Sequence, residues 1–258
     1  MKNLSINYYG ALTLFKKETF RFFKVYHQTI LAPVINALLF LAIFSLAFGK
    51  HTNFASDISF QEFIAAGLIM MTAMQNSFMN SSSSFMISKV MGHIIDYLMP
   101  PISAGELLLA ITLSAVCRGL VVAAAVFIAI YIFIPFWFFD LTYVLFYIFF
   151  AASFLGMLGI LAAVLSNTFD HMSAITSYFI TPLTFLSGTF YSVKSLPPFW
   201  QNVTAFNPFF YMIDGFRYGI TGYHDKNIAL GMSVVIFFNI LLGLIVYIIL
   251  KKSYKIKN

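Results

Sequence analysis

Six long apolar stretches constrain the fold of this chain more than any other feature. Each is close to or longer than the roughly 20 residues that a helix needs to cross a bilayer core of about 30 Å. The stretches lie at residues 31–49, 60–78, 107–134, 143–165, 173–190 and 228–250. A chain with 60% hydrophobic and only 9% charged residues has too little polar surface to fold as a soluble domain. The sequence therefore predicts an all-α integral membrane protein with six transmembrane helices in a single domain, residues 1–258.

The distribution of cations predicts the orientation of these spans. Lys50, Lys194, Arg217 and Lys226 fall on one side of the membrane, whereas the arm before the first span, the segment after the second span and the C-terminus hold most of the others. Cytoplasmic segments carry the excess of Lys and Arg. Both termini of this multi-pass protein are therefore expected in the cytoplasm.

Residues 8–26 form a basic arm ahead of the first span. An apolar face is predicted from helical spacing and consists of Tyr8, Leu12, Phe15, Phe22 and Tyr26. The opposite face consists of Thr13, Lys17, Arg21 and Lys24. Such an amphipathic helix lies in the headgroup plane on the cytoplasmic side. The arm either anchors the topology or also contacts a cytoplasmic partner.

The segment between the second and third spans has the pattern of a short cytoplasmic helix. The serine run at 81–84 offers N-cap candidates and Pro100 ends the pattern, so the second span is expected to stop before the serines and a helix to cover 83–97. The polar side chains of this helix are Ser84, Lys89, His93 and Asp96. The helix either docks another protein or only joins two spans.

The segment 189–226 on the outer side is longer than a turn. Its prolines divide it into two short helices, near 199–206 and 209–220. Asp214 and Arg217 are three residues apart and can pair on one helix face. The favoured interpretation is a re-entrant helical hairpin between the fifth and sixth spans, and the alternative is an amphipathic cap lying flat outside.

Arg118 is the one charge deep inside a predicted span. It should face protein or water, either as a cavity charge or as half of a structural pair. Ala115, Gly119 and Ala123 form a stripe of small residues that favours close helix packing there. Gln75, Asn76 and Asn80 end the second span with polar groups, which either line a pathway or bond a neighbouring helix.

The sequence lacks the common motifs of nucleotide-binding, metal-binding and hydrolytic sites. It has no complete phosphate-binding loop, no histidine pair with zinc-protease spacing and no nucleophile elbow, so no catalytic or metal-binding residue is predicted and the chain is not expected to be an enzyme. Its composition also argues against nucleic-acid binding. An ion-coupled carrier normally needs buried acidic groups, whereas the acids here lie near span ends.

The sequence resembles the transmembrane subunits of type-2 ABC exporters, the inner-membrane permeases of Gram-negative bacteria, over nearly its whole length. The resemblance is carried by LFKKETFRFFKVYHQTILAPVINALLFLAIF at 14–44, by MQNSFMNSSSSFMISKVMGHIIDYLMPPIS at 74–103 and by FLSGTFYSVKSLPPFWQNVTAFNPFFYMIDGFRYGITG at 185–222. It implies a homodimer in the bacterial inner membrane with two copies of a separate ABC ATPase. ATP and magnesium would bind that partner, and this chain would hold no cofactor.

The resemblance also implies roles for parts of the chain. The arm 8–26 would be the connecting helix, 83–97 the coupling helix and 199–220 the re-entrant outer hairpin. Docking to the ATPase would involve Ser84, Lys89, His93, Asp96 and, in the second inner turn, Asp170. The substrate pathway would include Gln75, Asn76, Asn80, Arg118, Thr181, Thr184 and Ser187. The outer gate would include Asn207, Pro208, Tyr211, Asp214 and Arg217.

The expected function is that of a permease subunit which moves an amphiphilic, drug-like, lipid or glycan substrate. Walls rich in aromatic and amide side chains, without a carboxylate cluster, suit such a substrate better than a small ion. The alternative is a stand-alone channel or ion-coupled carrier, in which Arg118 and the amides form a selective pore.

Overall fold

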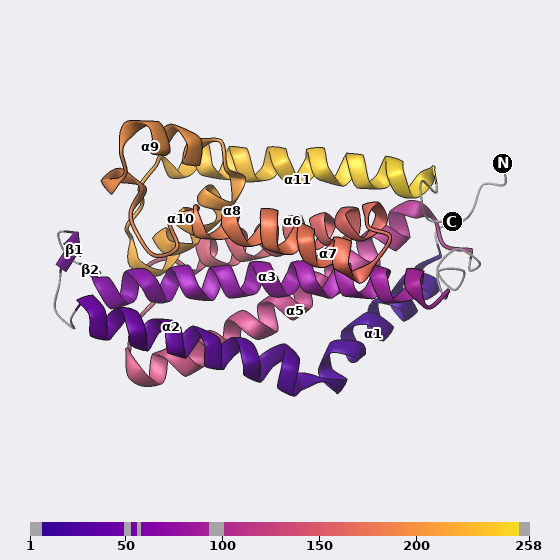
Figure 1. The fold of residues 1–258 in the computed structure, drawn as a ribbon, viewed down its shortest axis with the longest axis horizontal. Helices are drawn as coiled ribbons and strands as arrows, with labels where there is room; N and C mark the ends of the chain where they lie inside the picture. Colours follow the sequence, from indigo (N-terminus) through magenta and orange to yellow (C-terminus); the bar gives the residue numbers. More distant parts are fainter. Residues whose placement is uncertain (1–6, 49–52, 56–57, 93–100, 253–258) are drawn as a thin grey trace.

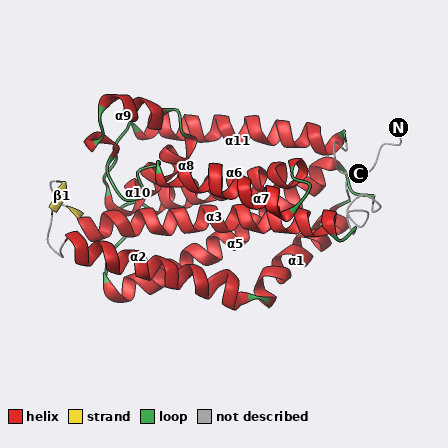
Figure 2. Cartoon of the chain, viewed as in Figure 1, coloured by secondary structure: helices red, strands yellow, loops and turns green. Residues whose placement is uncertain are grey.

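A computed structural model describes residues 7–48, 53–55, 58–92 and 101–252 of the chain. Long helices make up most of this part, and a two-stranded ribbon, β1 (Asn53–Ala55) and β2 (Ile58–Ser59), joins two of them (Figure 2). At the centre of the bundle, α3 (Phe60–Val90) packs along α5 (Ala104–Phe133) and α6 (Leu141–Leu165). Figure 1 shows α2 (Ala32–Phe48) and α11 (Ile228–Lys251) flanking these helices.

Four helices in the described part are long and apolar enough to cross a membrane: His27–Ala47, which combines the π-helix η1 (His27–Leu31) with most of α2, and α5, α6 and α11. The stretch predicted at 60–78 lies in α3, which is longer but more polar. Most of α3 is buried by other helices, so its polar residues face protein instead of lipid.

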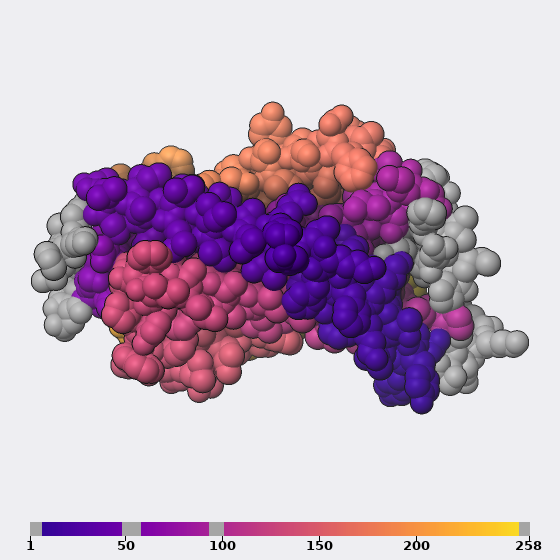
Figure 3. All heavy atoms as spheres, turned by 90° about the horizontal axis from the view of Figure 1, so that it is seen from below, coloured from indigo at the N-terminus to yellow at the C-terminus, as the bar shows by residue number. Residues whose placement is uncertain are grey.

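The stretch predicted at 173–190 falls mostly in a helical run over residues 169–185, called here the exposed run. It consists of α7 (Phe169–Ile175), the π-helix η2 (Thr176–Ile180) and α8 (Thr181–Phe185). Figure 3 shows it as salmon-coloured atoms that protrude from the edge of the molecule. The aromatic side chains of Tyr178 and Phe179 point away from the bundle, with 76% and 62% of their surface exposed.

The predicted break at the serine run 81–84 is wrong, because α3 continues through it to Val90. The 31 residues of α3 reach about 46 Å at the helical rise of 1.5 Å per residue. Ser81 and Ser82 are buried against α6, where a Cβ on Gly159 would lie only 2.5 Å from the carbonyl oxygen of Phe78. The serines are therefore small packing residues of a close helix contact, and they do not start a new helix.

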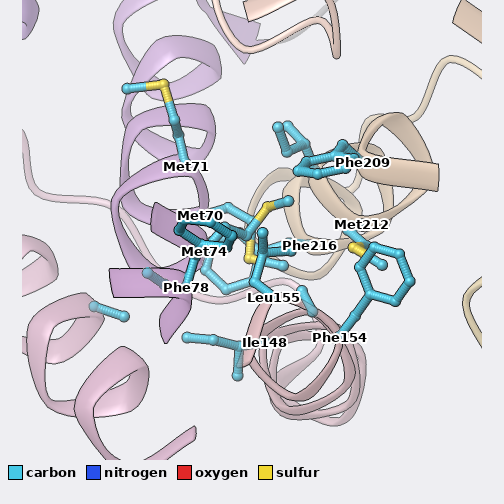
Figure 4. Packing of buried hydrophobic residues seen from close by; sticks show 14 of the residues in the cluster. Met70, Met71, Met74, Phe78, Ile148, Phe154, Leu155, Phe209, Met212 and Phe216 are labelled. Carbon is cyan, nitrogen blue, oxygen red and sulfur yellow. The ribbon is translucent and has the colours of Figure 1, made fainter. Parts of the chain in front are cut away.

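The core lies where α3, α6 and α10 (Pro208–Thr221) meet. Figure 4 shows Met74 and Phe78 from α3 packing with Leu155 from α6 and Phe216 from α10. A Cβ at Gly119 of α5 would lie 2.2 Å from the hydroxyl of Ser77, so α5 also approaches α3 closely. These glycines allow helix backbones to approach at a distance that any larger residue would prevent.

The arm forms α1 (Tyr8–Lys24), with the Asn7 side chain accepting a hydrogen bond from the backbone of Gly10 at its start. The buried face of α1 consists of Leu14, Glu18 and Phe22, and α1 packs against α5. On the predicted apolar face, Phe22 is buried against the bundle, whereas Tyr8, Leu12 and Tyr26 are exposed, and the predicted contact of this face with the headgroup plane stays a prediction. The spacing predicts an amphipathic helix. In a membrane, however, the side of such a helix that faces protein need not be the more apolar one.

The first and last described residues lie at one end of the bundle, called here the terminal end. The backbone N–H of Asn7 donates to Glu106 near the start of α5, and Gly105 lies beside Tyr247 near the end of α11. The ends of α3 and α6 lie at this same end (Figure 1). The β ribbon, the start of α6 and the end of α10 lie at the opposite end.

Two short helices fold back at the opposite end. After the single-turn η3 (Val193–Ser195), α9 (Pro198–Ala205) and α10 follow one another with Asn207 between them. The backbone N–H of Asp140, just before α6, donates to Gly219 O near the end of α10, while Phe209 at its beginning stacks edge-on with Phe154 of α6. The α9–α10 turn therefore lies about 20 Å along α6 from the start of that helix.

Candidate functional site

A cavity of about 530 Å³ lies between α1, η1 and α2 on one side and α3 on the other, and is called here the arginine cavity. Its polar lining residues are Arg21, Gln28, Thr29, Asn36, Thr72, Gln75, Asn76, Ser83 and Arg118. Its apolar lining includes Phe22, Phe40, Met71, Met79 and Ile87. The cavity thus combines hydrogen-bonding groups with an apolar wall, as pockets for organic molecules do.

Arg118 reaches this cavity from the middle of α5. Only 7% of its surface is exposed, and its guanidinium donates a 3.0 Å hydrogen bond to the side-chain oxygen of Asn76. The amide of Asn76 in turn donates to the carbonyl oxygen of Thr72, one turn earlier in α3. The Nε atom of Arg118 has no hydrogen-bond partner among the described residues. A buried cation is therefore bound to a neutral amide and keeps an unused donor.

The predicted pathway residues divide between this cavity and its surroundings. Gln75, Asn76 and Arg118 line it together. Asn80 does not line the cavity. Its amide instead donates a hydrogen bond to the hydroxyl of Ser114, between α3 and α5. Thr184 is buried behind the cavity wall, 3.5 Å from the amide nitrogen of Gln75.

The remaining two predicted pathway residues lie on either side of Thr184 in the chain. Thr181 is half-buried at the start of α8, and its carbonyl oxygen accepts a hydrogen bond from the Thr184 hydroxyl. Ser187 is buried, and its hydroxyl accepts a 2.9 Å hydrogen bond from the Asn207 amide. Ser187 therefore belongs to the contacts of the predicted gate and not to the cavity.

A polar cluster joins α1 to α3 beside the cavity. The carboxylate of Glu18 is buried, pairs with Arg21 at 3.1 Å and accepts a 2.6 Å hydrogen bond from the hydroxyl of Ser84. Arg21 also donates to the hydroxyl of Ser83 and, at 2.7 Å, to the carbonyl oxygen of Asn80. Arg21 therefore lines the cavity and fastens α1 to α3 at the same time.

Of the predicted docking residues, Ser84 and Lys89 are engaged within the chain. Ser84 binds Glu18 as above, and the ammonium group of Lys89 donates to the backbone oxygens of Val164 and Ser166 at 3.1 and 2.7 Å. Lys89 therefore holds the end of α6 to the end of α3.

The other docking residues are either at the surface or beyond the described chain. Asp170 is exposed in the first turn of α7, at the terminal end and next to the turn that Lys89 holds. His93 and Asp96, together with residues 93–97 of the predicted coupling helix, lie outside the described residues.

The predicted gate residues form two groups around α10. At its start, Asn207 caps the helix by accepting a hydrogen bond from Phe209 N and donates to the carbonyl oxygen of Leu183. Pro208 occupies the first helical position, where its fixed φ suits the helix. Tyr211 donates to the carbonyl oxygen of Ala205, so the turn between α9 and α10 is held from both sides.

The second group surrounds the pair predicted from spacing. The carboxylate of Asp214 and the guanidinium of Arg217 lie 4.0 Å apart and are both buried. Asp214 accepts hydrogen bonds from the backbone N–H groups of Asp225 and Lys226. Arg217 donates to the carbonyl oxygen of Gly188 and lies 3.7 Å from the centre of the Phe63 ring. The pair therefore joins α10 to three other parts of the chain.

A further carboxylate, which no sequence pattern singles out, extends this network toward the surface. Asp225 accepts hydrogen bonds from the hydroxyls of Ser192 and Tyr223 and from the backbone N–H of Val193. Burial raises the pKa of the Tyr223 hydroxyl, so the group stays protonated and donates at neutral pH. The loops before η3 and after α10 are thus held together.

The chain matches the family model "ABC-2 type transporter" over residues 9–221, which is most of its length and includes the cavity, the exposed run and α10. It belongs to the ABC-2 type transporter family. The inner membrane transport permease YadH of Escherichia coli (strain K12) is 32% identical over 252 residues, covering 97% of this chain and 98% of that relative. YadH of Shigella flexneri matches to the same extent, and nodulation protein J of Rhizobium leguminosarum bv. viciae is 32% identical over 78 residues, 30% of each chain.

Within this ABC-2 family chain, sequence reasoning missed Glu18, Asn36 and Asp225. Glu18 is the one acid in the basic arm, and it lies four residues from Leu14 on one side and from Phe22 on the other. Its place on the same helix face as two apolar residues could have indicated a polar contact within the protein. Asn36 is an amide inside the first apolar stretch, which also marks a polar contact or a cavity. Asp225 carried no such signal, because acids in loops are usually solvated.

Proposed function

We propose that the chain is the transmembrane permease subunit of an ATP-binding-cassette exporter in the bacterial inner membrane, driven by a separate ATPase that binds ATP and magnesium. Family membership over residues 9–221 carries the proposal, supported by the relatives named inner membrane transport permease. The substrate class is amphiphilic, and drug-like, lipid and glycan molecules all belong to it. The permease itself catalyses no reaction.

The terminal end is the cytoplasmic end in this proposal. The excess of Lys and Arg near the termini and near the end of α3 supports this orientation. The ATPase docks there, against the region between α3 and α5 and against the turn between α6 and α7. The hydrogen bonds from Lys89 to Val164 and Ser166 connect the end of α3 to the end of α6. A movement of the ATPase against either region would therefore be transmitted to both helices.

The helices α9 and α10 form the re-entrant outer gate. The contact between Phe209 and Phe154 supports this assignment, because it places the α9–α10 turn beside the middle of α6 and not beside its end. The backbone of that turn is bonded by Asn207 and Tyr211, as backbone at membrane depth requires.

Two copies of the chain form the transporter, with the exposed run of each copy at the seam. The run presents Tyr178 and Phe179 outward together with the hydroxyl-bearing Ser177, a mixture that fits a protein contact better than lipid alone. Each copy binds one ATPase, which gives two ATPase subunits.

Co-purification with an ATPase tests the proposal. The tagged chain is expressed with candidate ABC ATPases from the same genome, and complex formation and ATP hydrolysis are measured in lipid. A stable complex whose hydrolysis depends on both subunits is expected. Asp170→Lys should weaken the complex, whereas Lys226→Asp, an exposed charge change of the opposite sign in the loop after α10, should not. The proposal is wrong if no ATPase binds.

The alternative is a stand-alone channel or ion-coupled carrier. Arg118 facing a cavity is the observation that favours it, since charges within spans often mark ion pathways. The chain alone in liposomes would then carry flux without ATP, whereas the exporter proposal expects none.

A further inference from the structure

We propose that the arginine cavity binds the acidic headgroup of an anionic amphiphile, with the guanidinium of Arg118 contacting a carboxylate or phosphate. This inference rests on the proposed function, since it narrows the amphiphilic substrate to an anionic one. The same headgroup chemistry belongs to a transported molecule and to a resident membrane lipid, and the experiment below separates these two sources.

The charged side chains that line the cavity favour an anionic ligand. Arg21 and Arg118 both line the cavity, and among the described residues that line it none is an Asp or a Glu. Glu18 balances Arg21 from behind the wall at 3.1 Å, whereas the bonded side-chain partner of Arg118 is the neutral Asn76. A cation that is 93% buried without a counter-charge is costly, so an acidic ligand would supply the charge that the described chain does not.

The donors of the cavity match an acidic headgroup. The Nε of Arg118 is buried and has no partner in the described residues, and the amides of Gln75 and Asn36 also line the space. Guanidinium groups bind carboxylates and phosphates through parallel hydrogen bonds, and amides add neutral donors around them.

The rest of the cavity fits the apolar part of such a molecule. Phe40, Met71 and Met79 line it, and methionine side chains adapt to varied apolar shapes. Phe40 and Met79 are also partly exposed, at 36% and 50%, and α2 and its neighbour η1 present most of their surface outward. An acyl chain in the membrane thus has a lateral route between α2 and α3 while its headgroup reaches Arg118.

Binding of a fluorescent fatty acid tests this assignment. The full chain is placed in nanodiscs of neutral phosphatidylcholine and titrated with 11-(dansylamino)undecanoic acid or with its methyl ester. The wild type should bind the acid at least about 10-fold more tightly than the ester, which corresponds to about 1.4 kcal/mol. Arg118→Gln should remove this preference and Arg118→Lys should keep part of it. Equal binding of acid and ester by the wild type overturns the proposal.

Asn36 provides a test that does not disturb the core. It lies on α2 outside the buried core and lines the polar cavity wall opposite α3, so a charged side chain at this position can reach the polar groups of the cavity instead of lipid. Asn36→Asp should weaken binding of the acid and Asn36→Lys should strengthen it, each by about 3-fold or more, with little effect on the ester. If both variants bind the acid as the wild type does, the headgroup does not occupy this cavity.

Phosphatidylglycerol in the nanodiscs separates the two sources. If a resident anionic lipid fills the cavity, added phosphatidylglycerol will compete with the acid in the wild type but not change the residual binding of Arg118→Gln. If the cavity is selective for a free anionic amphiphile, the preference for the acid will persist. The ATPase is absent from these measurements, so a failure to form the ATPase complex would leave this result standing, and the reverse also holds.

Discussion

The ammonium group of Lys89 donates a 2.7 Å hydrogen bond to the carbonyl oxygen of Ser166, which joins the last turn of α3 to the turn after α6. These residues are 77 positions apart in the sequence. A cation at the C-terminal end of a helix is favourable because the final carbonyl oxygens have no partners within the helix. Lys89 therefore serves the permease as an internal clamp, which its predicted role as a docking residue did not anticipate.

Replacing Lys89 by methionine should loosen this clamp while keeping the length of the side chain. The loss of hydrogen bonds to a charged group should lower the free energy of unfolding by about 1–2 kcal/mol. The same variant should reduce ATP hydrolysis in the complex, because the α6–α7 turn would no longer follow α3. Lys252→Met, at the exposed end of α11, is the matched control and should change neither quantity. Unchanged melting and hydrolysis in Lys89→Met would contradict the clamp.

The pair of Asp214 and Arg217 supports a double-mutant test. Both groups are buried, so Asp214→Asn removes the carboxylate 4.0 Å from the Arg217 cation, leaves only the weaker attraction of Asp225, and should cost about 3 kcal/mol. The double variant with Arg217→Met removes both charges and should be more stable than Asp214→Asn alone. Thermal unfolding of the purified variants measures both effects. Strictly additive losses would mean that the two side chains act independently.

The sequence predicted this pair correctly because three-residue spacing on a helix is a local rule. It could not predict the partners of Arg217, namely Phe63 and Gly188, because they come from other parts of the chain. The same limit explains the serine run. Ser81 and its neighbours look like a turn by composition, yet inside a membrane bundle small residues mark the closest helix contacts, here with Gly159.

The cavity illustrates what composition can and cannot provide. The sequence alone points to Arg118, Gln75 and Asn76, because polar residues in apolar stretches need a partner. Their assembly with Arg21 and Asn36 depends on how α1 and α2 pack against α3, and no periodicity in the sequence records that packing. The sequence likewise left two roles open for Asn80, a place in the pathway or a bond to a neighbouring helix, and the structure shows its amide bonded to Ser114 of α5.

Glu18 should hold α1 against the bundle. Glu18→Gln keeps the shape of the side chain but removes its charge, which weakens the 3.1 Å ion pair with Arg21 and the 2.6 Å hydrogen bond from Ser84. We expect faster hydrogen–deuterium exchange across α1, by about 10-fold for a loss of about 1.4 kcal/mol. Lys16→Gln, an exposed position on the same helix, should leave the exchange unchanged. Equal protection of α1 in both variants would show that apolar packing alone holds the arm.

The proposed seam between two copies predicts where the chain can be cross-linked to itself. In a two-fold symmetric dimer, residues near the axis lie opposite their own copies, and a disulfide needs the two Cα atoms within about 7 Å. Single cysteines at Ser177, Tyr178 and Thr181, in a chain with Cys117→Ser, should include at least one that forms a disulfide-linked dimer on mild oxidation in native membranes. Phe237→Cys is the control on α11, where 61% of the side chain is exposed. Dimers from Phe237→Cys together with none from the exposed run would place the seam on α11 instead.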